Sequence, residues 1–85
     1  MKILYFASLR RSIGVGEEDV TPPPDIDRVD ALITWLKART PAHAAAFAAC
    51  RRLNVAVNQE HAGLDHPLTA GDEVAFFPPV TGGCR

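Results

Sequence analysis

The residues best placed to do chemistry lie at the C-terminus, in the run Pro78-Pro79-Val80-Thr81-Gly82-Gly83-Cys84-Arg85. The two prolines cannot continue a strand and direct the chain outward in an extended conformation. Glycine has no Cβ, so Gly82-Gly83 can thread a narrow channel and leaves the Gly83 carbonyl open to attack. The six residues from Phe77 to Gly83 reach at most about 20 Å. This pattern predicts a flexible tail that is delivered into another protein.

The strand before this tail ends in two phenylalanines, Phe76 and Phe77. Adjacent residues of a strand point to opposite faces, so both rings cannot pack beneath a helix. We expect one of them to lie on the surface beside Pro78, Pro79 and the segment Val80-Thr81. Exposed aromatic side chains often anchor interfaces, so these six residues are predicted to bind a protein partner.

Composition excludes several classes of function. The 85-residue chain carries nine Lys and Arg against ten Asp and Glu, a net charge of −1. Its only basic pairs, Arg10-Arg11 and Arg51-Arg52, are expected to be solvated, so a nucleic-acid partner is not predicted. A domain of this size buries roughly 60–65% of its unfolded surface and has little room for a deep substrate cavity. No apolar run approaches the roughly 20 residues that span a bilayer, and residues 1–7 are too short for a signal peptide. We therefore expect a cytoplasmic protein without a membrane partner.

Two strands and two helices are expected in the first part of the chain. Residues 2–8 are rich in β-formers with apolar side chains on both faces, which indicates an interior strand, and residues 9–16 have the composition of a connector. Residues 17–21 predict a short strand that Pro22-Pro23-Pro24 ends. A helix is expected from a cap at Asp27 to just before Pro41, because Val29, Leu32, Ile33 and Leu36 share one face. A second helix begins with Thr40 as its N-cap.

Three further strands and a fold class follow from the remaining residues. Residues 53–58 alternate strictly, residues 59–66 indicate a turn with a short irregular strand, and residues 73–77 alternate again. Strands before and after a helical segment indicate an α+β fold with helices on one face of the sheet. We predict the β-grasp architecture, a mixed sheet of four to five strands, with residues 1–79 as the domain and residues 80–85 as the tail.

Four stretches of the chain together match a known family. They are residues 3–10, residues 55–59 with residues 65–68, and the thirteen consecutive positions Gly71-Asp72-Glu73-Val74-Ala75-Phe76-Phe77-Pro78-Pro79-Val80-Thr81-Gly82-Gly83. On these residues the chain resembles the MoaD family, the small ubiquitin-like sulfur-carrier subunits of molybdopterin synthase. The match covers most of the domain.

The resemblance implies a carrier rather than an enzyme that works alone. A ubiquitin-activating-like adenylyltransferase would use ATP to adenylate the carboxylate of Gly83. Sulfur from a persulfide donor would then displace AMP and leave a thiocarboxylate. The tail would enter the large catalytic subunit of molybdopterin synthase and give its sulfur to a pterin precursor. Gly83 would bear the sulfur and Gly82 would provide the slim approach, with no permanently bound cofactor and no metal.

The chain departs from the family pattern after Gly83, because Cys84 and Arg85 follow. The hypothesis is that both residues are removed, since an internal amide offers no carboxylate to adenylate. The alternative is that Cys84 carries the sulfur as a persulfide.

Three other functions stay open on the sequence. One is a sulfur carrier for thiamine synthesis, which shares the fold and the tail chemistry. Another is a ubiquitin-like modifier or binding module without sulfur. The third is a metal site built from His43, His61, His66 and Cys50, although their spacing matches no zinc pattern and surface histidines are expected instead.

Overall fold

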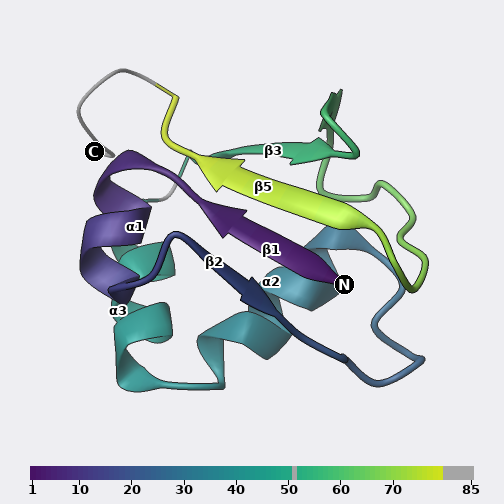
Figure 1. Ribbon diagram of the computed structural model, residues 1–85, viewed down its shortest axis with the longest axis horizontal. Helices are drawn as coiled ribbons and strands as arrows, with labels where there is room; N and C mark the ends of the chain where they lie inside the picture. The colour runs from purple at the N-terminus through teal and green to yellow at the C-terminus, as the bar shows by residue number, and fades with distance from the viewer. Residues whose placement is uncertain (51, 80–85) are drawn as a thin grey trace.

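The computed structural model describes residues 1–50 and 52–79. Within them five strands form one mixed sheet in the order β2-β1-β5-β3-β4, and only the central pair β1 and β5 is parallel (Figure 1). This is the α+β architecture that the sequence predicts. The elements are β1 (Lys2–Tyr5), α1 (Ala7–Ile13), β2 (Glu17–Asp19), α2 (Val29–Lys37), α3 (Pro41–Ala49), β3 (Asn54–Val57), β4 (Glu60–Ala62) and β5 (Glu73–Phe77).

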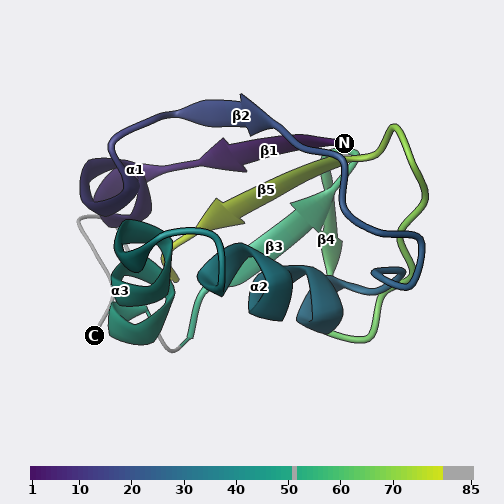
Figure 2. The same ribbon diagram turned by 90° about the horizontal axis from the view of Figure 1, so that it is seen from below.

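The core lies between the sheet and the helices α2 and α3, which sit on the same side of it (Figure 2). The period-2 alternation of the strands sends one set of side chains into this layer. At its centre Phe76 stacks on Tyr5 with the ring centroids 6.3 Å apart, and Phe47 of α3 meets Phe76 edge-on at 5.3 Å. Each of these aromatic contacts adds to the free energy gained by burial.

Helix α1 corrects the sequence prediction of a connector at residues 9–16. The interior strand β1 is confirmed, but it ends at Tyr5, and Ala7–Ile13 turns into a helix that Gly14 closes in the left-handed conformation (φ 95°). This helix is seven residues long and buries only Leu9, so its sequence shows no sustained apolar stripe. It is held by packing against α3 and the end of β5, contacts that no local pattern reveals.

Helix α2 is capped one residue later than the sequence predicts, at the residue after Asp27. Its N-cap is Arg28, which gives no side-chain cap, and the first amides are satisfied from a distant loop. The Val29 N–H donates to the His66 carbonyl at 3.1 Å and the Asp30 N–H to the Leu64 carbonyl at 2.8 Å. Main-chain acceptors brought by tertiary structure thus replace the side-chain cap.

Helix α3 has the cap that its sequence predicts. Thr40 Oγ1 accepts the His43 N–H at 3.1 Å, and Pro41 takes the first helical position.

A partly buried polar cluster ties the edge strand β2 to helix α3. One carboxylate oxygen of Glu18 accepts from the Tyr5 hydroxyl at 2.5 Å and from His43 Nε2 at 2.7 Å. Arg39 lies 3.6 Å from the other oxygen, and Thr40 Oγ1 lies 2.7 Å from His43 Nδ1. Burial tends to raise the pKa of Glu18, but the hydrogen bonds from Tyr5 and His43 and the nearby positive charges outweigh it and lower that pKa. The cluster therefore favours an ionised Glu18 in the folded protein.

Replacing Glu18 with Gln should lower the free energy of unfolding at pH 7 by about 2 kcal/mol, because charge-assisted hydrogen bonds are lost. The pKa of Glu18 in the folded state lies below its ordinary value of 4.5, so its stabilisation is present above pH 4.5 and is lost as the pH falls through the folded-state pKa. Urea unfolding should show wild type and Glu18→Gln far apart at pH 7 and converging well below pH 4.5. Glu17→Gln is the matched control, since Glu17 is exposed and has only a surface ion pair with Lys2. A difference that stays constant with pH would contradict this assignment.

Candidate functional site

The position of the tail is set by β5, the central strand of the sheet. This strand pairs with β1 on one side and β3 on the other, so its end is held on both sides. Pro78 is half-buried and Pro79 is exposed. The tail therefore begins at a fixed point of a rigid sheet. Six sequence-predicted residues, Val80, Thr81, Gly82, Gly83, Cys84 and Arg85, lie outside the described residues.

The two phenylalanines before the tail have opposite environments. Phe76 is fully buried, at 0% exposure, between Tyr5 and Phe47. Phe77 points to the other face of the sheet, where it is half-buried and meets the exposed His61 edge-on with the ring centroids 5.7 Å apart. Of the six predicted partner-binding residues, Phe76 thus belongs to the core, because the pleat turns it under the helices. Phe77 is the ring that lies near the surface, directly before Pro78 and Pro79.

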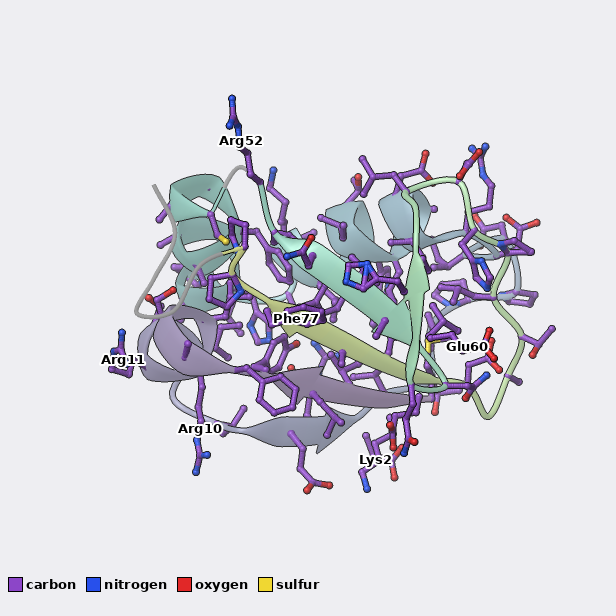
Figure 3. All side chains as sticks on the ribbon, turned by 90° about the horizontal axis from the view of Figure 1, so that it is seen from above. Lys2, Arg10, Arg11, Arg52, Glu60 and Phe77 are labelled. Carbon is purple, nitrogen blue, oxygen red and sulfur yellow. The ribbon has the colours of Figure 1, made fainter. Side chains whose placement is uncertain are left out.

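Phe77 does not stand alone on this face. Strand register places Leu4 opposite Ala75, Ala75 opposite Ala56, and Ala56 opposite His61, and the row continues onto β2 with Glu17 opposite Leu4. Phe6 directly follows β1, where its N–H donates to the carbonyl of Phe76 in β5, and its side chain is 47% exposed. No helix of the described residues covers this side of the sheet (Figures 2 and 3). We call the set the open-face patch: Leu4, Phe6, Ala56, His61, Ala75 and Phe77.

The open-face patch has features of a surface that docks on a protein. Leu4, Ala75 and Ala56 form the apolar middle of its row, the ring of Phe6 is exposed and that of Phe77 is half-buried. Such a surface offers aromatic anchors of the kind that protein interfaces use. Five of its members, all except Phe77, were not predicted to bind a partner, since Leu4 and Phe6 signal only that β1 has two apolar faces. Register across β1, β5, β3 and β4 is what brings the set together.

The expectation that all three histidines lie on the surface is wrong for one of them. His61 and His66 are exposed as predicted, but His43 is buried, at 6% exposure, because α3 turns it toward Tyr5 and Glu18. In the part of the chain that the structure describes, no three His, Cys, Asp or Glu side chains gather closely enough to hold a metal ion. Nor is any helix of those residues long and apolar enough to cross a membrane.

The family of this chain follows from its match to a model of known protein sequences. A model of the ThiS family matches residues 3–83, nearly the whole chain including both tail glycines. The chain belongs to the ThiS family. Its β-grasp fold is shared with solved structures described below, so the predicted fold class is confirmed. The ThiS-family model covers the open-face patch and the tail as far as Gly83.

Three proteins of known name are similar to this chain over nearly its whole length. The molybdopterin synthase sulfur carrier subunit of Escherichia coli is 45% identical over 83 residues, which cover 98% of this chain and 99% of that protein. A putative molybdopterin converting factor subunit 1 of Pyrococcus furiosus superposes with a TM-score of 0.74 at 35% identity, covering 93% and 95% of the two chains. Small archaeal modifier protein 1 of Haloferax volcanii superposes with a TM-score of 0.75 at 30% identity, covering 94% and 97%. The predicted resemblance to sulfur carriers is thus confirmed.

Proposed function

We propose that this ThiS-family chain is the sulfur carrier subunit of a cytoplasmic molybdopterin synthase, with Gly83 as the residue that bears sulfur. The observation that carries the proposal is the end-to-end match to a curated carrier of that name, which includes the terminal Gly82-Gly83. The position of the end of β5, which contributes Phe77 to the open-face patch, supports it, since a carrier must be held while its end reacts elsewhere. The chain holds no cofactor of its own in this proposal.

The chemistry is that of a carboxylate made reactive by ATP. The Gly83 carboxylate attacks the α-phosphate of ATP on an adenylyltransferase, and pyrophosphate leaves. The terminal sulfur of a donor persulfide then attacks the acyl carbon, and AMP leaves. A thiol reduces the acyl disulfide so formed and releases the thiocarboxylate. Glycine at positions 82 and 83 suits these reactions because no Cβ obstructs the acyl carbon.

The large catalytic subunit of the synthase is the proposed acceptor. The tail enters its active site, where the thiocarboxylate gives sulfur to the pterin precursor. The open-face patch docks on the same subunit and keeps the tail directed at that site. The adenylyltransferase would bind the same patch at an earlier step.

The test is a reconstituted reaction with a chain that ends at Gly83, an adenylyltransferase, ATP and a persulfide donor. The intact mass should rise by the difference between sulfur and oxygen, and the product should convert a pterin precursor when the large subunit is added. A chain that ends at Thr81 should gain no mass, while its melting temperature stays within about 2 °C, because an apolar-poor end adds little stability. A mass gain in the Thr81-terminated chain, or none in the Gly83-terminated one, would contradict the proposal.

A second candidate function is protein modification, favoured by the superposition on small archaeal modifier protein 1. In that case activated Gly83 is attacked by a lysine amine of another protein. Lysates supplied with tagged, Gly83-terminated chain should then contain covalent adducts that resist thiol reagents. If the tag remains on free chain and on its thiocarboxylate only, modification is excluded.

A further inference from the structure

Three arginines stand at the end of the molecule where the tail departs. Because β1 and β5 are parallel, both end there, and α1 follows β1 directly with Arg10 and Arg11. Because β3 is antiparallel to β5, it begins there with Asn54 opposite Phe77, and Arg52 precedes it by two residues. Figure 3 shows the three side chains projecting at this end of the sheet, whereas Lys2 and Glu60 lie toward the opposite end. We call Arg10, Arg11 and Arg52 the basic rim.

The basic rim is exposed, and the described residues around it do not neutralise its charge. All three side chains are exposed, and within residues 1–50 and 52–79 none lies within 4.0 Å of a carboxylate. The other two described arginines behave differently, since Arg28 lies 3.6 Å from Asp30 and Arg39 lies 3.6 Å from Glu18. The rim charges are therefore available to a partner.

The acidic groups gather at the other end of the sheet. Asp19 and Glu73 both stand opposite Lys2 in the strand register, and Lys2 pairs with Glu17 at 3.5 Å. The N-terminal ammonium lies 3.8 Å from Asp19. The open-face patch thus has a basic end at the tail and a mixed, largely acidic end away from it. A charge pattern of this kind fixes the direction in which a partner docks.

We propose that the basic rim binds carboxylates on the large synthase subunit that flank the opening through which the tail enters. This rests on the proposed function and names the chemistry of its docking site. Arginine suits the task because its planar fork matches a carboxylate in two hydrogen bonds. A polar rim around an apolar centre is also the usual anatomy of a specific protein interface. The rim orients the carrier so that the tail, not the acidic end, meets the opening.

The test measures association of the Gly83-terminated chain with the large synthase subunit by stopped-flow fluorescence. Arg11→Glu and Arg52→Glu should each slow association about tenfold at ~0.05 M salt. The difference from wild type should vanish at about 1 M salt, where the screening length falls to about 3 Å. Lys37→Glu is the matched control, because it makes the same charge change on an exposed residue of α2 in the helical layer. It should alter the rate less than about twofold.

Each outcome bears on the proposal. A salt-dependent loss confined to the rim variants supports it. If Lys37→Glu slows association as much as the rim variants do, the effect comes from net charge and the proposal is wrong. The proposal is also wrong if the rim variants associate as fast as wild type. If ATP or inorganic phosphate alone shifts the rim guanidinium resonances, the rim is a small-anion site and the proposal is wrong. If wild type transfers sulfur yet its association ignores salt, only the rim inference fails. If wild type neither binds the large subunit nor transfers sulfur, the proposed function fails with it.

Discussion

The 85-residue chain should form no thiocarboxylate in a reconstituted reaction, whereas the same chain ended at Gly83 should be converted fully. Adenylation needs a free α-carboxylate, and in the longer chain the Gly83 carbonyl belongs to a peptide bond with Cys84. An amide oxygen is a poor nucleophile toward ATP, so the effect is all or none. Intact mass spectrometry after incubation with the adenylyltransferase, ATP and a persulfide donor measures it.

The two residues after Gly83 then act as a removable block on the carrier. Adding a peptidase that removes Cys84 and Arg85 should restore conversion of the 85-residue chain. Cys84→Ser is the control, because it should behave like the parent chain both before and after trimming. Sulfur bound by the untrimmed chain, and lost in Cys84→Ser, would instead establish a persulfide on Cys84.

Substitution of Phe77 should weaken partner binding, whereas substitution of the adjacent Phe76 should weaken folding. Phe77→Asp should weaken binding to the large synthase subunit by about 2–4 kcal/mol, which is about 30- to 1000-fold in Kd, because it puts a charge into an aromatic anchor of the interface. Its free energy of unfolding should change little, since Phe77 is only half-buried and lies on the uncovered face of the sheet (Figure 3). Titration calorimetry and urea unfolding on the same preparation separate the two effects.

Phe76→Ala is the matched partner of that variant. Phe76 is fully buried against Tyr5 and Phe47, so truncating it should cost about 3–5 kcal/mol of unfolding free energy. The fraction that remains folded should bind the large subunit with an affinity close to that of wild type. Comparable destabilisation by both variants would mean that Phe77 is a core residue. Unchanged affinity in Phe77→Asp would remove the open-face patch from the mechanism.

The strands and their alternating faces could be predicted from sequence because their signal is local. Alternation in residues 53–58 predicts Val55 and Val57 toward the core, and both are buried there. Alternation in residues 73–77 predicts that Val74 and Phe76 share a face, but only the structure shows that this face is the buried one. The N-cap at Thr40 could also be predicted from the sequence, since a capping side chain bonds within the first turn of its own helix. The Gly82-Gly83 end after two prolines likewise needed only the chain itself, and the family match includes it.

Other features were decided by contacts between residues far apart in the chain. Helix α1 exists because α3 and β5 give it a surface to pack on, and α2 starts where the Leu64 and His66 carbonyls meet its first amides. His43 is buried because Glu18, 25 residues away, supplies a carboxylate for its ring. The open-face patch and the basic rim need the parallel pairing of β1 with β5 and the antiparallel pairing of β3 with β5. Periodicity determines which face of a strand is apolar, but only strand order and register determine which neighbours share that face.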